Sequence, residues 1–195
     1  VRTLGADSYV VCSVIAKSSN YQETIKSLQD ASKDGLSNKE LLLRKKACET
    51  LAFGSDHVGL NYKNELMDLA KKLEYHVIDH GTFDSKRMDY PEIAFKVANE
   101  VSKGNADKGI LVCGTGVGMS IAANKVSNIR AVVCSEEYSA AMSRGHNDTN
   151  VLCLGERVIN LEVAKAILEL WLNTNFESGR HQKRVEMIDN SLAHL

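Results

Sequence analysis

The stretch that decides the fold is Gly109-Ile110-Leu111-Val112-Cys113-Gly114-Thr115-Gly116-Val117-Gly118-Met119-Ser120. Its first part is a short apolar run of the kind that forms a buried strand. The glycines at alternate positions let the backbone turn tightly and present N–H groups to an anion, and a helical pattern begins behind them. We therefore expect a strand, an anion-binding loop and a helix N-terminus in immediate succession.

The same strand-then-helix pattern repeats along the chain after residue 50. Short apolar runs predict buried parallel strands at residues 51–53, 76–78, 109–113, 131–134 and 151–154. Helical patterns lie between and after them, at residues 60–73, 93–101, 118–126, 138–144 and 161–172. This alternation predicts an α/β fold, namely a three-layer α/β/α Rossmann-like domain with a five-stranded parallel sheet.

The segment before this domain differs in composition. Residues 17–50 are polar and rich in Lys, Ser and Asn, with helical patterns at Tyr21–Ala31 and Asn38–Cys48. We predict an N-terminal polar, helical extension over residues 1–50 and the α/β domain over residues 51–195. Gly179 predicts a turn that redirects the C-terminal segment toward a second subunit.

Composition narrows the class of protein. The 195-residue chain carries 24 Lys and Arg against 25 Asp and Glu, and this near-neutral balance disfavours nucleic-acid binding. Its five cysteines form no CxxC pair, which predicts reduced thiols and a cytoplasmic location. No apolar run approaches the roughly 18 residues of a membrane-spanning helix. No cluster of metal ligands is evident in the sequence. We expect no membrane segment, no metal and no other cofactor.

Reactive side chains gather where the predicted strands end. Asp56 and His57 follow the first strand, Cys113 closes the third, and His146 and Asn147 follow the helix after the fourth. Ligands of open α/β sheets bind beyond the carboxyl ends of the strands. These side chains are therefore the candidates for a functional pocket. The other histidines lack such polar company and are expected to be structural or solvated: His76, His80 and His194.

Cys113 and the pair Arg180 and Arg184 each have both a functional and a structural interpretation. Cys113 could be a small apolar filler, but the loop behind it would stabilise a thiolate, which can act as a base. Cys134 and Cys153 lack that loop and are expected to be core residues. Arg180 and Arg184 share one face if they lie on a helix, so they could grip a phosphate together rather than form a solvated basic end.

The glycine loop has a competing interpretation as a dinucleotide-binding fingerprint. That pattern, GxGxxG, requires glycine at the position of Met119, and it usually follows the first strand of the fold rather than the third. An oxidoreductase that binds a nucleotide is therefore a weaker hypothesis than an enzyme or sensor for a small phosphorylated ligand.

Several motifs together resemble one family. In order along the chain they are Gly54-Ser55-Asp56-His57, Asp89-Tyr90-Pro91, Cys113 to Ser120, His146-Asn147-Asp148 and Gly179-Arg180-His181-Gln182. In this order and spacing, over about residues 51 to 190, they resemble ribose-5-phosphate isomerase type B. The resemblance implies an aldose–ketose isomerase that interconverts ribose 5-phosphate and ribulose 5-phosphate through an enediolate, without a metal.

The resemblance also implies the roles of single residues. Cys113 would move a proton between C1 and C2 of the open-chain sugar, and Thr115 with the loop N–H groups would hold the enediolate oxygen. His146 would open the furanose ring, and Asp56 would contact the reacting hydroxyls. His57 and the two arginines would bind the phosphate. The implied substrate-binding residues are His57, Tyr90, Gly114, Gly116, Val117, Gly118, Ser120, Asn147, Arg180 and Arg184.

In ribose-5-phosphate isomerases of type B, which this sequence resembles, the active site lies between two subunits. The resemblance thus implies a homodimer or tetramer in which the neighbour supplies His146 and Asn147, and an inactive monomer. Gly145 stands where relatives more often carry a larger residue, which predicts a looser helix end beside His146. Two alternatives stay open: an isomerase of allose 6-phosphate or galactose 6-phosphate, and a sensor that binds a phosphosugar without turnover.

Overall fold

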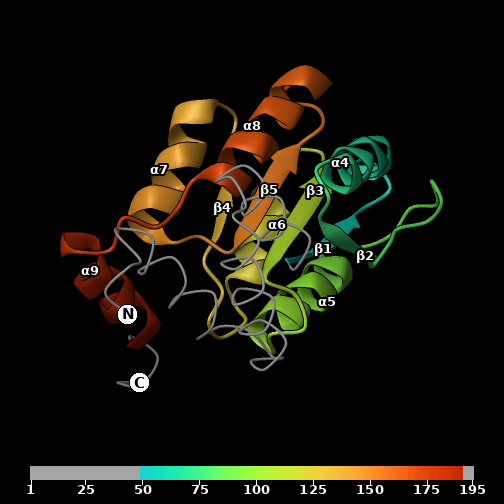
Figure 1. Ribbon diagram of the computed structural model, residues 1–195. Coiled ribbons are helices and arrows are strands. Elements are labelled where there is room, and N and C mark those ends of the chain that lie inside the picture. The colour runs from blue at the N-terminus through green and yellow to red at the C-terminus, as the bar shows by residue number, and fades with distance from the viewer. Residues whose placement is uncertain (1–48, 191–195) are drawn as a thin grey trace, which may run out of the picture. The chain divides into compact units, whose positions relative to one another are not determined.

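Five parallel strands form the central layer of the computed structural model, which describes residues 49–190 (Figure 1). The strands are β1 (Thr50–Ser55), β2 (His76–Asp79), β3 (Lys108–Cys113), β4 (Ala131–Val133) and β5 (Val151–Gly155). Their order across the sheet is β2-β1-β3-β5-β4, and every neighbouring pair is parallel. The predicted five-stranded parallel sheet is confirmed.

Helices cover both faces of this sheet. They are α4 (Leu60–Lys72), α5 (Tyr90–Ser102), α6 (Val117–Ala123), α7 (Glu137–Asn147), α8 (Leu161–Asn173) and α9 (Arg180–Asp189). One buried cluster joins α4, α7 and α8 to one face of the sheet, and a second joins α5 and α6 to the other. Successive side chains of a strand point to opposite faces, so both faces need apolar residues. The three-layer prediction is confirmed.

The third strand illustrates how this double burial arises. Ile110 and Val112 belong to the cluster on the α4, α7 and α8 side, whereas Leu111 and Cys113 belong to the cluster on the α5 and α6 side. All four are at most 5% exposed. Burying one such aliphatic side chain contributes about 1.5–3 kcal/mol, so a polar residue in place of Ile110, Leu111 or Val112 would destabilise the domain.

The ends of two helices differ from the predictions in ways that matter for function. The helix predicted from residue 93 begins at Tyr90, because Pro91 fits the first turn and has no N–H to leave unpaired. The helix predicted over residues 138–144 runs on to Asn147. His146 therefore lies in the last turn of α7 and not in the loop after it, which corrects the prediction.

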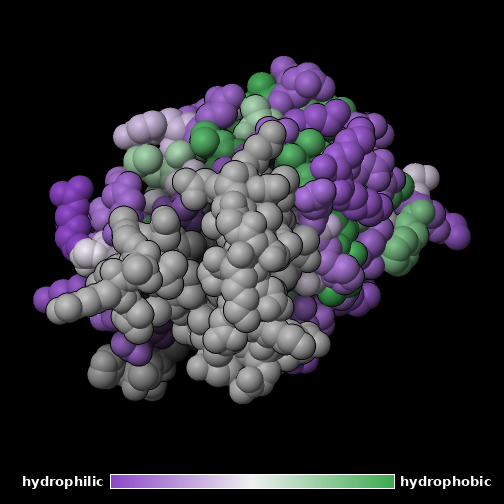
Figure 2. All heavy atoms as spheres, in the orientation of Figure 1, coloured by the Kyte–Doolittle hydropathy of each residue, from purple (hydrophilic) through white to green (hydrophobic). Residues whose placement is uncertain are grey.

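The remaining predictions concern the chain ends and the surface. The two helices predicted at residues 21–31 and 38–48 lie outside the described residues, as does His194. On the face shown in Figure 2, hydrophilic side chains cover much of the described surface. Among residues 49–190, the helices include none with the length and apolar character needed to cross a membrane.

Candidate functional site

Cys113 sits at the last position of β3 with its sulfur inside the glycine loop. The Gly116 backbone N–H donates to Sγ at 3.1 Å. Gly116 adopts φ +80°, a left-handed conformation that favours glycine, and α6 starts directly after it. A backbone N–H aimed at the sulfur stabilises its anionic form. The predicted succession of strand, glycine loop and helix is confirmed, and anion binding by the loop stays a prediction.

The rest of the loop is arranged around an open side. Thr115 is exposed, and its Oγ1 accepts a hydrogen bond from Val117 N at 3.4 Å. The Tyr90 ring lies so close to Gly118 that a Cβ there would come within 2.7 Å of it. A larger residue at 118 would therefore displace the Tyr90 ring, and Tyr90, itself 40% exposed, borders the loop. The Ser120 hydroxyl donates to Val117 O within α6.

The turn after β1 packs against the end of β3. Asp56 N donates to Val112 O at 3.2 Å, and Asp56 Oδ1 accepts from Val58 N and Gly59 N at 2.9 and 3.0 Å. These bonds fix the carboxylate beside the strand that carries Cys113. His57 is half-buried in the same turn. In the sheet, β2 lies on one side of β1 and β3 lies on the other, so the direction of the connections reverses between β1 and β3. The carboxyl ends of these two strands therefore flank the crevice where open α/β sheets bind ligands.

Arg157 is a cation at this site that the sequence analysis missed. The backbone N–H of Arg157 donates to Gly114 O at 3.0 Å. Its side chain covers Gly114, and Arg157 Cδ lies 3.6 Å from where a Cβ on Gly114 would stand. The signal was available, because Arg157 is the second residue after β5 and strand ends are where functional residues gather. An arginine there adds positive charge to a loop of N–H donors.

A second polar cluster lies where α7 ends and α9 begins. The His146 and His181 rings stack, with centroids 4.1 Å apart and planes 6° from parallel. The Glu177 carboxylate approaches the Nε2 atoms of His146 and His181 at 3.7 and 3.8 Å. Arg180 Nε donates to His181 Nε2 at 3.2 Å. Burial, and then the charges of His146 and Arg180, lower the pKa of His181.

The composition of this cluster raises the question of a metal site. His146, Glu177 and His181 offer donor atoms that all lie within 4.8 Å of one another. The lone pair of an imidazole nitrogen lies in the ring plane, and the two planes here are parallel and separated. Both histidines therefore cannot direct a lone pair at one ion, as zinc ligation requires. The geometry is that of a stacked pair instead.

Gly145 makes room for Glu177. Glu177 N donates to Gly145 O at 2.9 Å, and a Cβ on Gly145 would stand 3.3 Å from Glu177 Oε1. The helix continues through this buried glycine to Asn147. The expected loosening of the helix end is thus not what the structure has.

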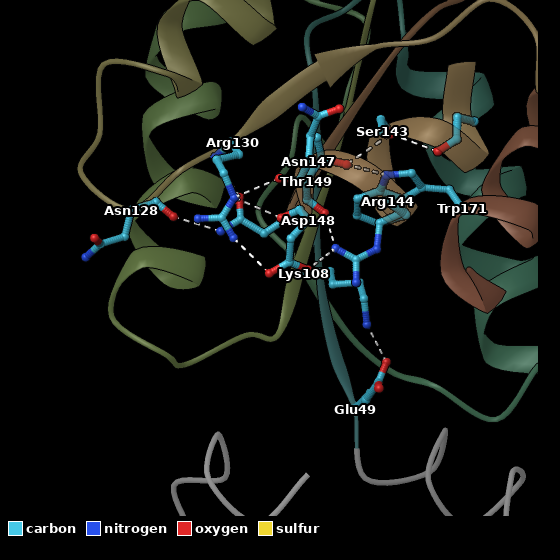
Figure 3. A network of polar contacts seen from close by, with 12 residues as sticks. Glu49, Lys108, Asn128, Arg130, Ser143, Arg144, Asn147, Asp148, Thr149 and Trp171 are labelled. Atoms are coloured by element: carbon cyan, nitrogen blue, oxygen red, sulfur yellow. Dashed lines mark hydrogen bonds and ion pairs between the residues drawn. The ribbon is translucent and has the colours of Figure 1, made fainter. Parts of the chain in front are cut away.

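Two arginines hold the end of α7 in place (Figure 3). Arg130 Nε donates to the carbonyl oxygens of Asn147 and Asp148 at 3.2 and 3.0 Å, and its Nη1 pairs with the Asp189 carboxylate of α9 at 3.0 and 3.1 Å. Arg130 thereby ties the last turn of α7 to the far end of α9. Arginine can serve this many acceptors because its donors form a rigid fork.

Arg144 completes this arrangement from inside α7. Its Nη1 donates to Asp148 Oδ1 at 2.8 Å and to Thr149 O at 2.6 Å, and its guanidinium lies over the Trp171 ring. Trp171 Nε1 in turn donates to Thr149 Oγ1 at 2.9 Å. The turn that follows His146 and Asn147 is therefore anchored to the core.

The two clusters lie at opposite ends of the strands. The Cys113 cluster is at their carboxyl ends, and the His146 cluster is at their amino ends. Cys113 pairs with Gly155 at the end of β3, whereas Gly109 pairs with Val151 near its start. Since α7 runs back against the strand direction, its last turn returns to the start of the sheet. About 3.3 Å per residue separates positions along a strand, so roughly 13 Å of β3 lies between the two ends. The structure therefore brings Asp56 and Cys113 together, as the strand ends predicted, whereas His146 lies away from them within the same chain, which corrects that part of the prediction.

The other cysteines and histidines behave as core or surface groups. Cys134 is 1% exposed and burial raises its pKa to about 11, while Cys153 is fully buried and burial raises its pKa as well. Both are confirmed as core residues. His76 is exposed at the start of β2, and His80 is half-buried after it.

Comparison with known proteins places the chain in a family. The profile of the Ribose/Galactose Isomerase family matches residues 51–188. Ribose-5-phosphate isomerase B of Escherichia coli K12 is 57% identical over 138 residues, which are 71% of this chain and 93% of that protein.

Solved structures agree with this match. Ribose-5-phosphate isomerase B of Clostridium thermocellum superposes with a TM-score of 0.73 at 50% identity, covering 74% of this chain and 98% of that one. The Mycoplasma genitalium enzyme with bound ribulose 5-phosphate gives a TM-score of 0.72 at 38% identity, covering 75% and 97%. This chain therefore belongs to the Ribose/Galactose Isomerase family.

Proposed function

We propose that this chain interconverts ribose 5-phosphate and ribulose 5-phosphate, with Cys113 as the base. The observation that carries the proposal is the contact of Cys113 Sγ with Gly116 N at 3.1 Å, in a loop that faces the crevice between β1 and β3. The names of the relatives at 57% and 50% identity support the choice of sugar.

The chemistry at the loop requires one base for two neighbouring carbons. The Cys113 thiolate removes the proton on C2 of the open-chain aldose, and negative charge develops on the C1 carbonyl oxygen. Thr115 and the loop N–H groups stabilise that oxygen, with Arg157 adding positive charge nearby. The Cys113 thiol then returns the proton to C1, while the proton of the C2 hydroxyl moves to the C1 oxygen beside Asp56.

Ring opening and phosphate binding use the second cluster. His146 donates a proton to the ring oxygen of the furanose as the bond from C1 to that oxygen breaks, and the C1 hydroxyl loses its proton to water as it becomes the aldehyde. Asn147 holds sugar hydroxyls. Arg180 and Arg184 are both exposed on the first turns of α9, where they fit a doubly charged phosphate. These groups and Cys113 lie at opposite ends of the strands. We therefore propose that a second copy of the chain supplies them.

The surface beside the glycine loop suits such a second copy. Val117 and Ile121 lie one helical turn apart on α6 and are 50% and 58% exposed, and the Tyr90 ring lies against Gly118 of the same helix. Cys113 keeps 5% of its surface exposed, next to the exposed Thr115. An apolar neighbour on α6 would complete the wall of the site.

The proposal is tested by assaying turnover of ribose 5-phosphate with purified full-length protein. Cys113→Ala should abolish turnover, and Cys134→Ala, which removes a buried thiol outside the site, should retain it. Turnover by Cys113→Ala would refute the assignment of the base. Saturable binding of the sugar without turnover by the wild-type chain would favour a sensor. Comparing kcat/KM for ribose 5-phosphate, allose 6-phosphate and galactose 6-phosphate ranks the substrates.

The shared site is tested by mixing two inactive variants. Cys113→Ala and His146→Ala each damage a different half of the proposed site. If chains exchange at random in a symmetric dimer, about a quarter of the sites in an equal mixture carry both intact halves. Activity should therefore return to that level after unfolding and refolding together. A mixture that stays inactive, while mixtures of wild type with either variant keep activity, would contradict the shared site.

A further inference from the structure

His181 is a side chain to which the mechanism above gives no role. It lies in the first turn of α9, is 5% exposed, and stands between Arg180 and the last turn of α7. Burying an imidazole without hydrogen-bond partners is costly, so the contacts of His181 decide whether its burial is stable.

The ring of His181 uses its edge and its face for different partners. At its edge, Nε2 accepts the Nε–H of Arg180 at 3.2 Å. An imidazole nitrogen that accepts a hydrogen bond carries no proton, so the proton of the neutral ring is on Nδ1. On its face, the ring stacks against His146 at a centroid distance of 4.1 Å.

We propose that His181 is a positioning residue that joins the phosphate grip to ring opening, orienting Arg180 by accepting its Nε–H and fixing the plane of His146 by stacking. The inference rests on the proposed function, because it assigns those roles to Arg180 and His146. A phosphate drawn onto Arg180 would then find His146 already oriented toward the sugar, without loss of side-chain freedom on binding.

The surroundings of His181 favour the neutral form that this role requires. Burial comes first, and the charges of His146, Arg180 and Arg184 act in the same direction, so the pKa of His181 is lowered. The Glu177 carboxylate acts in the opposite direction, but it is 56% exposed to solvent. Water screens its charge, so its effect is weaker than its distance suggests.

Two substitutions separate the two contacts. His181→Phe keeps a stacking ring but loses the acceptor. It should raise KM for ribose 5-phosphate and Ki for inorganic phosphate by roughly tenfold, the effect of a lost hydrogen bond to a charged group, with kcat little changed. His181→Gln keeps an acceptor near Nε2 but loses the ring. It should leave both constants nearly unchanged and lower kcat from ribose 5-phosphate by roughly tenfold.

The direction of the reaction gives a second measurement. Ribulose 5-phosphate cannot close a furanose ring, because its C5 oxygen carries the phosphate, so its conversion starts from the open chain. His181→Gln should therefore keep more of the initial rate from ribulose 5-phosphate than of the rate from ribose 5-phosphate. KM and this ratio of rates do not depend on the folded fraction, so both stay readable if the variants lose stability.

His76→Phe, a change at an exposed histidine in β2, serves as the matched control and should match the wild type. If both His181 variants lose kcat equally in both directions with unchanged KM and Ki, the positioning role is overturned. If they behave as the wild type, it is overturned as well. A wild-type chain without turnover would instead refute the proposed function, which is a separate result.

Discussion

Replacing Gly116 by alanine tests how the glycine loop serves the sulfur, and Gly104 offers a matched control. Both glycines have left-handed backbone, with φ +80° and +75°. An L-residue in that conformation costs about 1–2 kcal/mol. A Cβ on Gly104 would meet nothing within 4 Å, so Gly104→Ala should show that cost alone.

The cost at Gly116 is larger because the new methyl group meets atoms that cannot move easily. A Cβ there would stand 3.1 Å from Val133 Cγ1 and 3.2 and 3.3 Å from the carbonyl carbons of Leu154 and Cys153. Overpacking of this kind adds about 1–3 kcal/mol. At about 2–4 °C per kcal/mol for a chain of this size, Tm of Gly116→Ala should lie about 2–12 °C below that of Gly104→Ala.

Activity should separate the two variants further. Displacing Gly116 N from Cys113 Sγ removes a hydrogen bond to a thiolate, which lowers kcat/KM about 10- to 100-fold. Gly104→Ala should retain wild-type kcat/KM. The assay is isomerisation of ribose 5-phosphate at a temperature where thermal melts show both variants folded. Equal kcat/KM for the two variants would refute the role assigned to the Gly116 N–H.

Further predictions concern stability, thiol reactivity and assembly. Arg130→Lys keeps the charge but not the fork, and should lower the free energy of unfolding in urea by about 1–3 kcal/mol. The pKa of His181 lies below its ordinary 6.5 in the folded chain, so protonation favours unfolding and stability should fall as pH drops below that value. His181→Phe should flatten this dependence in urea titrations at roughly pH 7.5 and 5.5. In native protein, iodoacetamide should alkylate Cys113 before Cys153, which peptide mapping can check. Ile121→Glu, at an exposed position on α6, should give a folded but inactive monomer by light scattering, and an active monomer would contradict the shared site.

The sequence predicted the layers well because the pattern that encodes them is local. The apolar run of β3, the glycines after it and the helix behind them lie within a dozen residues, and each is buried or turned as its composition requires. The end of α7 could not be read in this way. Gly145 is a poor helix former, yet the contact of Glu177 with Gly145 keeps the helix intact as far as Asn147.

Contacts between distant segments were beyond the sequence for the same reason. Arg157 reaches Gly114 because β3 and β5 are neighbours, although β4 comes between them in the chain. The stack of His146 on His181 joins residues from two helices, and neither residue type predicts a ring partner. Local pattern thus identifies which residue types can do chemistry, whereas the order of strands decides which of them meet.

The distance between the two clusters within one chain bears on how copies of the chain assemble. In a parallel sheet the loops after the strands lie at the carboxyl ends of the strands, and the C-terminal ends of the helices lie at the amino ends. Cys113 is in the first group and His146 is in the second, so the topology keeps them apart within one chain. Moving them together within one chain would require α7 to leave the core to which Arg144 and Trp171 attach it. A two-fold dimer can bring Cys113 of one copy next to His146 of the other without any such change. Because the interface is symmetric, it would form two such sites. If Cys113 and His146 act on the same sugar, each chain therefore contributes to two sites and completes neither alone.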